Sequence, residues 1–481
     1  MKKRYSMGSY LAGAVAARAG DEMSGPALML AGFALAGSTA DASSLLAGVT
    51  VSAAAGGPVL GVLLDRARRP GRLVAAALVL YATGLGLILV GLDRLPFAAT
   101  VLIAVVTGLL GPALSGGWTA QLPRVVPGDR LPRANALDAM TFSAASLAGP
   151  ALAGVVAEAL GAPSAVVVSA ALIVSALPAA WLLPARPGRT RDARPGRDGD
   201  ARPGRTQGAR PGRTRDARPG RTRDARPGRA RDARPGRTQG ARPGRTRDAR
   251  PGRARDARPG RTQGARPGRT WDARAASVIG DLAAGTRVIV GRPPLARATL
   301  TSIVTCVAQG MLTACLPLLG ERALGGSGRG AVLLSCAAIS ALVANAVLAR
   351  FPRSVAPDTV VWAGALVQAA ALALCASGRP AVLVVAVLIL GAGEGPQLAA
   401  LFAVRHREAP EHLRGQIFTT GASLKITGFA LGAAVAGPAA NWSLPGALAL
   451  AATVAALAVL VFLAVPSAKA ASSAGRAGPH S

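Results

Sequence analysis

The chain has 481 residues, a formal net charge of +32 and a hydrophobic fraction of 51%, and its mean hydropathy is +0.38. The charge is unevenly placed, because residues 185–272 contain 28 of the 55 Lys and Arg residues but few hydrophobic ones. This division excludes a single soluble basic domain. The four cysteines follow no motif spacing, which excludes a disulfide scaffold and a cysteine-based zinc site.

Long apolar segments recur on both sides of the basic block, and each is long enough to cross a bilayer as a helix of roughly 20 residues. A soluble protein with this many buried helices would need polar helix faces, which these segments lack. We therefore predict an all-α membrane protein with about 12 transmembrane helices. The predicted spans are residues 12–36, 43–64, 73–92, 97–122, 135–160, 163–183, 296–319, 330–349, 359–377, 380–404, 416–440 and 445–465.

The basic residues predict the orientation of these spans. If both termini are cytoplasmic, 21 Lys and Arg residues outside the basic block fall on the cytoplasmic side. Only four fall on the opposite side, namely Arg94, Arg322, Arg329 and Arg379. This bias is the positive-inside pattern, and it also supports an even number of spans.

Residues 185–275 are predicted to be a disordered cytoplasmic linker. Residues 185–272 consist of eleven octads with Pro at every eighth position and Gly after it, a pattern that forbids a packed core or a stable helix. The many arginines favour contact with anionic lipid headgroups. Nucleic-acid binding is not favoured, because Trp271 is the one aromatic residue available for base stacking. An expanded repeat without a function of its own is the simpler interpretation.

The linker separates two similar halves, residues 1–184 and 276–466, and a cytoplasmic tail at 467–481 follows. At a fixed offset of 284 residues, Arg66 corresponds to Arg350 and Arg130 to Arg414. Parallel six-helix repeats are typical of transporters whose substrate site lies between the repeats. Gly-Pro pairs inside the spans are predicted to let helices bend or pack closely, and they are Gly111, Pro112, Gly149, Pro150, Gly395, Pro396, Gly437 and Pro438.

The loop after the second predicted span reads GVLLDRARR from Gly61 to Arg69. This segment resembles the loop motif of the major facilitator superfamily, G-x-L-x-D-R-x-G-R-R, through Gly61, Leu63, Asp65, Arg66 and Arg69. Two positions depart from the motif, since Arg68 replaces the second Gly and Pro70 replaces the last basic residue. The resemblance covers both halves and implies two pseudo-symmetric six-helix bundles.

Within this superfamily the chain is most similar to actinobacterial exporter-like members. The similarity is carried by Arg18-x-x-Asp21-Glu22, by Arg405-His406-Arg407 and by Ser423-Leu424-Lys425. It implies export of a small organic compound by alternating access of the two halves.

Ionisable residues inside the predicted spans are candidates for substrate binding or proton coupling, because an unpaired charge at that depth costs several kcal/mol. Arg18, Asp21 and Glu22 share one helical face and are expected to neutralise one another. Flanking charges place Asp21, Glu394 and Lys425 at a similar height near the middle of the bilayer. The resemblance implies that the spans carrying Asp21, Glu22 and Glu394 line a central cavity. A structural Glu394–Lys425 or Arg18–Glu22 ion pair is the alternative.

Asp138 is predicted to cap its span at the membrane interface, although it is also a candidate for function. The resemblance implies that Asp65 is a cytoplasmic latch that bonds to a neighbouring helix end or arginine and breaks when the transporter opens inward. The latch and gate candidates are Gly61, Asp65, Arg66, Arg130, Arg350 and Arg414. No P-loop is present, and the histidines are placed in cytoplasmic loops or the tail without metal-ligand spacing, so we expect no metal, cofactor or enzymatic activity.

These features predict a secondary transporter in the plasma membrane of a bacterium, with a small molecule and protons as its partners and the proton gradient as its energy source. It is expected to be a monomer. Two alternatives stay open. One is uptake of a small metabolite, and the other is a membrane receptor or scaffold that does not transport and uses its Arg-rich loop.

Overall fold

The computed structural model describes residues 5–36, 39–186, 280, 282–326 and 329–465. The predicted linker and the C-terminal tail fall almost entirely outside these residues. Six of the long helices begin with proline in their first two positions, which suits a helix start because the amide that proline lacks has no partner there. The described residues form helices and connecting turns, without a strand.

The first half contains seven α-helices and three short helical turns. They are α1 (Met7–Ala36), α2 (Thr39–Arg66), α3 (Pro70–Arg94), α4 (Phe97–Gly108), η1 (Ala113–Gly117), η2 (Leu122–Arg124), η3 (Gly128–Arg130), α5 (Leu131–Leu160), α6 (Ala162–Ser175) and α7 (Leu177–Trp181). The second half contains α9 (Pro293–Leu324), α10 (Gly330–Arg350), α11 (Pro357–Cys375), α12 (Pro380–Glu408), η5 (Glu411–Leu413), α13 (Arg414–Trp442) and α14 (Leu444–Ala464). A short apolar helix, Leu282–Gly291, precedes α9.

Eleven helices of the described chain are long and apolar enough to cross a membrane. Every predicted span overlaps one of them except the first, which corresponds to α1. This helix has 30 residues but carries Arg18, Asp21 and Glu22, whose charges lower its hydropathy. The span predicted at 380–404 ends too early, because α12 continues to Glu408.

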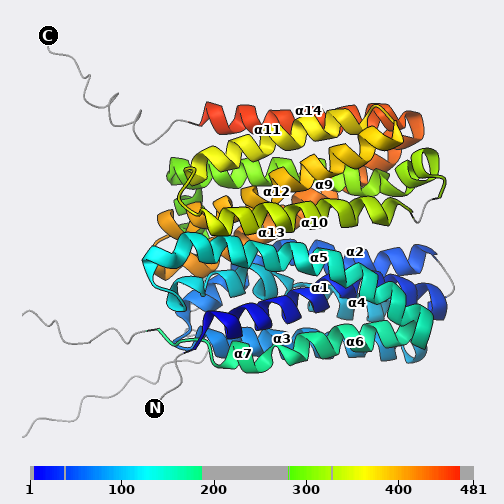
Figure 1. The fold of residues 1–481 in the computed structure, drawn as a ribbon. Helices are drawn as coiled ribbons and strands as arrows, with labels where there is room; N and C mark the ends of the chain where they lie inside the picture. Colours follow the sequence, from blue (N-terminus) through cyan, green and yellow to red (C-terminus); the bar gives the residue numbers. More distant parts are fainter. Residues whose placement is uncertain (1–4, 37–38, 187–279, 281, 327–328, 466–481) are drawn as a thin grey trace, which may run out of the picture. The chain divides into compact units, whose positions relative to one another are not determined.

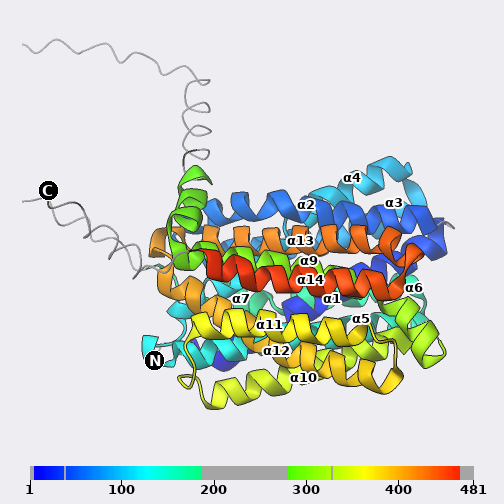
Figure 2. The ribbon, with the colours of Figure 1, turned by 90° about the horizontal axis from the view of Figure 1, so that it is seen from above.

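Each half has its own apolar core, and the two halves pack against each other in one compact unit. Figure 1 shows α1–α7 as one group of helices and α9–α14 as the other, with α2 and α5 bordering α13 and α10. In Figure 2, which views the bundle from above, α2 and α13 again lie side by side. A smaller apolar cluster, which includes Ala136, Ala399 and Phe418, joins the halves.

The start of α1, the end of α2 and the start of α13 lie at the same end of the bundle, on the left in Figure 1. We refer to it as the Asp65 end. The charge bias predicts that this end faces the cytoplasm.

The four Gly-Pro pairs lie in different surroundings. Gly111 and Pro112 lie where α4 has ended, just before the π-helical turn η1, whereas the other three prolines lie inside continuous helices. A Cβ at Gly149 would lie 2.7 Å from Cβ of Glu22, and one at Gly395 would lie 2.6 Å from the carbonyl oxygen of Ala341. Close helix packing therefore explains these two glycines. Gly437, like Gly111, has no such neighbour within 4 Å.

Candidate functional site

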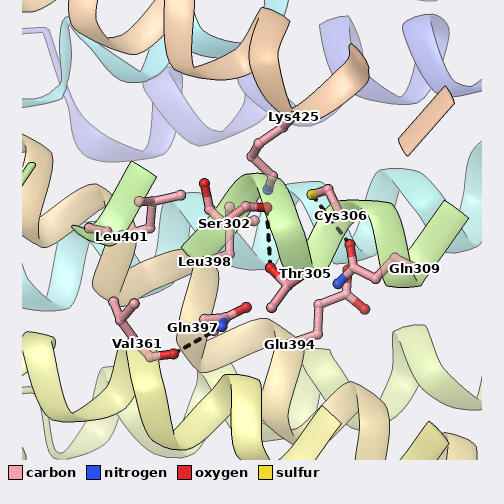
Figure 3. A pocket seen from close by; sticks show the side chains of 11 residues that line it. Ser302, Thr305, Cys306, Gln309, Val361, Glu394, Gln397, Leu398, Leu401 and Lys425 are labelled. Carbon is pink, nitrogen blue, oxygen red and sulfur yellow. Dashed lines mark hydrogen bonds between the residues drawn. The ribbon is translucent and has the colours of Figure 1, made fainter. Parts of the chain in front are cut away.

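A small cavity inside the second half brings an acid and a base together. Its volume is about 20 Å³, and it is enclosed by α9, α11, α12 and α13. Glu394 of α12 and Lys425 of α13 both line it, together with Cys306 and Gln309 of α9. Figure 3 shows Lys425 reaching down from α13 toward Cys306, with Glu394 across the cavity. Glu394 and Lys425 do not form an ion pair within 4 Å in the described chain, so the alternative of a direct structural bridge is wrong for this conformation.

Glu22 of the first half does not line this cavity but interacts electrostatically with Glu394. Its segment of α1 packs directly on Gly149 of α5. Asp21 points differently, toward Tyr81 of α3 within its own half. The structure therefore brings Glu394 and Lys425 together in one cavity, whereas Asp21 and Glu22, which were expected to line a central cavity with Glu394, do not line it.

Three glutamine side chains are joined by hydrogen bonds beside Glu394, and two of them, Gln309 and Gln397, line the cavity. Gln309 donates to Gln368 over 3.0 Å, and Gln368 donates to Gln397 over 2.8 Å. Gln397 in turn donates to the backbone carbonyl of Val361 over 2.9 Å. Because these amides come from α9, α11 and α12, the hydrogen-bonded glutamines fix the positions of three helices around the cavity.

Arg18 is paired with Asp138, not with the acids of its own helix. Its guanidinium donates to Oδ1 of Asp138 over 3.0 Å, and both side chains are almost fully buried. Tyr10 donates to the same oxygen, and Thr119 bonds both Asp138 and Arg18. Arg18 therefore forms no ion pair with Asp21 or Glu22 in the described chain, so the expected direct pairing within α1 and the alternative Arg18–Glu22 pair are wrong, although the charge of Arg18 still interacts with that of Asp21. The capping role predicted for Asp138 is not observed, because this carboxylate is 0% exposed and pairs with Arg18 inside the bundle.

His406 bonds the two halves together near this network. Its Nδ1 lies 2.9 Å from Oδ1 of Asn135, and its Nε2 lies 3.2 Å from the carbonyl oxygen of Thr119. Its ring stacks at 4.4 Å from that of Phe418. The predicted loop position of His406 is wrong, because α12 extends past it and both of its ring nitrogens contact the first half.

Arg405 was also predicted to lie in the cytoplasmic loop, but its side chain is 2% exposed. Its guanidinium lies 5.9 Å from the ring of Phe418 and packs against Gly421 of α13. Unlike Arg18, it contacts no carboxylate in the described part of the chain.

Asp65 joins the halves at the Asp65 end of the bundle. Its two carboxylate oxygens accept hydrogen bonds from the backbone amides of Gly415, at 2.9 Å, and Gln416, at 2.8 Å. These amides lie in the first turn of α13, where the helix dipole favours a negative charge. Arg186, which follows α7, pairs with the same carboxylate at 2.8 Å. Gly61, one turn earlier, allows α2 to approach Gln416, because a Cβ there would lie 2.3 Å from its Cα.

The remaining gate candidates lie at the same end, and the hydrogen bonds and ion pair described for Asp65 do not involve Arg130, Arg350 or Arg414. Arg130 precedes α5, Arg350 ends α10 beside the ring of Phe351, and Arg414 begins α13. Arg66 is the last residue of α2. A second link between the halves comes instead from Arg353, which donates to the carbonyl of Asp129 over 2.9 Å.

Replacing Asp65 with asparagine is expected to favour separation of the halves at the Asp65 end. The substitution removes the charge from two hydrogen bonds, so we expect a loss of about 2 kcal/mol, which shifts the equilibrium roughly 30-fold. Spin labels at Arg69 and Glu411, in a background without the native cysteines, would report the change as longer distances between the labels. The matched control is Asp93→Asn at the other end, where the carboxylate is 74% exposed.

Gly61→Ala tests the contact between α2 and the start of α13 by a steric clash. It should also lengthen the distance between the spin labels. Gly86→Ala is its control, because a Cβ there meets nothing within 4 Å. Distances that stay unchanged in both Asp65→Asn and Gly61→Ala would show that this contact does not hold the Asp65 end closed.

A larger groove of about 810 Å³ lies on the outside of the first half, between α3 and α7. Its lining is apolar apart from Arg72, which packs over the ring of Trp181 at 4.9 Å. It lacks the combination of acid, base and amides found in the cavity of the second half, so we take the cavity lined by Glu394 and Lys425 as the candidate functional site. Within the residues that the structure describes, no three His, Cys, Asp or Glu residues gather as a metal site.

Comparison with known proteins gives a family match and several similar folds. Residues 10–425 match the family model of the Major Facilitator Superfamily, and no curated protein matches the chain. The human organic anion transporter MFSD10 (TETRAN) has a similar structure, with a TM-score of 0.64, 15% identity, and coverage of 96% of this chain and 100% of that one. A bacterial homologue of the iron transporter ferroportin in an outward-facing state has a TM-score of 0.64 and 13% identity, over 95% of this chain and 98% of that one.

The E. coli fucose:proton symporter is also similar, with a TM-score of 0.58 and 15% identity, over 96% of this chain and 98% of that one. These identities are low, so the likeness to solved structures concerns the fold alone.

Proposed function

The chain belongs to the Major Facilitator Superfamily, and we propose that it is a secondary active transporter that exports a small organic compound in exchange for protons. Its family makes it a multi-pass membrane transporter and not an enzyme. The proposal adds the proton gradient as the energy source, export as the direction, and the residues that couple proton movement to transport.

The observation that carries the proposal is the grouping of Glu22, Glu394 and Lys425. Glu394 and Lys425 line the same cavity of the second half, and Glu22 of the first half interacts electrostatically with Glu394. A carboxylate in such a place changes its proton affinity when water enters or when a neighbouring charge moves. When the halves separate, water can enter and the neighbouring charges move apart. The motion that exposes the substrate would therefore also let a carboxylate bind or release a proton.

Alternating access is supported by the contacts at the Asp65 end. Asp65, His406 and Arg353 each bond across the two halves there. In our proposal this end faces the cytoplasm of a bacterium, and the described conformation is closed on that side. We also propose that α1 crosses the membrane, which brings the number of spans to twelve. Breaking these contacts would open the path inward.

Export is favoured by the resemblance to exporter-like members, and uptake of a metabolite is the second candidate. A receptor or scaffold without transport is the third. We further propose that the protein acts as a monomer, that it carries no cofactor, and that the arginines of residues 185–272 contact anionic lipid headgroups.

Deleting residues 187–272, which keeps Arg186 and its pair with Asp65, should leave transport unchanged, because the groups proposed for coupling all lie within the two helical halves. The measurement is uptake and release of a panel of small organic compounds by proteoliposomes that contain the full chain or the deletion variant. Equal rates support a transporter with a passive linker. Loss of all flux, with the variant inserted and folded as shown by its melting temperature, would favour a role that depends on the Arg-rich segment.

A further inference from the structure

The cavity-lining face of α12 ends in a buried arginine. Glu394, Leu398 and Leu401 line the cavity. Arg405 is four residues beyond Leu401, so helical periodicity places it on the same face, one turn nearer the Asp65 end. Its guanidinium is within electrostatic reach of Cys306, which lines the cavity from α9.

The niche that holds this guanidinium depends on a glycine in α13. A Cβ at Gly421 would lie 2.3–2.7 Å from three atoms of the Arg405 guanidinium. Lys425 follows Gly421 by four residues and therefore lies one turn, about 6 Å, along the same helix. Lys425 thus lines the cavity, whereas Arg405 does not line it but lies about one helical turn nearer the Asp65 end.

Arg405 lacks the partners that a buried arginine normally has. Its Nε and Nη2 atoms are buried without a hydrogen bond, and no carboxylate of the described chain lies within ion-pair distance. Arg18 shows the contrast, because it is equally buried but is held by Asp138, Thr119 and Thr141. An unpaired buried charge is costly, and a planar guanidinium with free donors is suited to a carboxylate or phosphate group.

We propose that Arg405 and Lys425 together bind the anionic group, a carboxylate or a phosphate, of the transported compound. This inference rests on the proposed transport function and names the chemical class of its substrate. At about 20 Å³ the cavity holds about one water molecule in this conformation, so the side chains around it would have to move apart to admit the anionic group. The rest of the compound would extend toward the interface between the halves, where Glu22 approaches.

The test measures the charge preference of the cavity at Cys306, without requiring transport. In the full chain, Cys315, Cys336 and Cys375 are replaced by alanine so that Cys306 is the only thiol. Cys306 is labelled with an anionic reagent, sulfonatoethyl methanethiosulfonate, and with its cationic trimethylammonium analogue. Each rate is divided by the rate of the same reagent with a free thiol, which removes the difference in reactivity between the reagents. We expect the anionic reagent to be favoured by about tenfold, because the nearby cations attract it.

Arg405→Gln should reduce this preference by about threefold, because Lys425 remains, while Arg405→Lys should retain most of it. Arg407→Gln is the matched control, because Arg407 lies two residues away but is 45% exposed and paired with Asp358. If Arg405→Gln does not fold, Gly421→Ala provides a second variant, since it fills the niche of the guanidinium. Benzoate or inorganic phosphate should also slow labelling of Cys306 by neutral N-ethylmaleimide, and whichever protects shows which anion is preferred.

A preference for the cationic reagent, or equal preference that Arg405→Gln leaves unchanged, would overturn the proposal. Protection by benzylammonium equal to that by benzoate and phosphate would overturn it as well. Failure of every reagent to reach Cys306 would show that no ligand of this size enters the site, which also contradicts it. Because none of these readouts depends on flux, they separate this inference from the proposed function.

Discussion

Replacing Arg18 with methionine is expected to destabilise the protein by about 3–5 kcal/mol, because it leaves the carboxylate of Asp138 buried without its counter-charge. Asp138 is 0% exposed, and its remaining bonds from Tyr10 and Thr119 come from neutral hydroxyls. The ring of Phe142 also loses the guanidinium that lies 3.7 Å from its centre. The measurement is the melting temperature of the purified variant in detergent.

The double variant Arg18→Met/Asp138→Asn distinguishes the cost of an uncompensated buried charge from the cost of lost side-chain packing. We expect it to be more stable than Arg18→Met alone, because neither partner then leaves an uncompensated charge. Arg94→Met is the control, since Arg94 is 76% exposed. A melting temperature for Arg18→Met equal to that of this control would show that the Arg18–Asp138 pair does not hold the first half together.

Replacing Glu394 or Glu22 with glutamine is expected to abolish proton-coupled transport while leaving expression and folding normal. Glutamine has nearly the same size and can hydrogen-bond, but it cannot bind or release a proton. The measurement is compound flux into proteoliposomes with and without an imposed pH gradient. Each variant should lose the dependence of flux on that gradient.

Glu158→Gln is the matched control, because Glu158 is an exposed glutamate of α5 that lies outside the cavity of the second half. Asp21→Asn is a second comparison, and its position toward Tyr81 leads us to expect a smaller effect than at Glu22. Full flux with unchanged pH dependence in the single variants at Asp21, Glu22 and Glu394 would rule out coupling by these acids.

The lengths of the apolar segments predicted most of the fold, because few backbone structures other than a helix can cross a bilayer. Ends of helices were less predictable. The charges at Arg405 and Arg407 suggested a loop, whereas α12 continues through both of them. A charged residue marks the edge of a span only if it faces water or lipid headgroups, and Arg405 faces the neighbouring helices instead.

Helical spacing predicts which residues share a face, but it does not predict what that face meets. Arg18 lies three and four residues from Asp21 and Glu22, and that spacing suggested local neutralisation. The packing of α1 on α5 instead offers Arg18 a carboxylate 120 residues away. Pairs of this kind depend on tertiary structure and are not visible in one helix.

The glutamine chain was missed, although a signal was present. Gln309, Gln368 and Gln397 are isolated amides inside otherwise apolar segments, and buried polar groups in a membrane need partners. Treating every uncharged polar residue in a span as a site candidate would have found them. His406 shows the opposite case, because its site is recognisable only after the two halves have packed.

The most direct test of proton-coupled export follows the pH inside proteoliposomes that contain the full chain while an outwardly or inwardly directed gradient of each compound is applied. We predict that a transported compound moves protons in the opposite direction, and that Glu394→Gln stops this proton movement. Transport of a compound at the same rate with no proton movement, whatever the imposed pH gradient, would contradict the proposal.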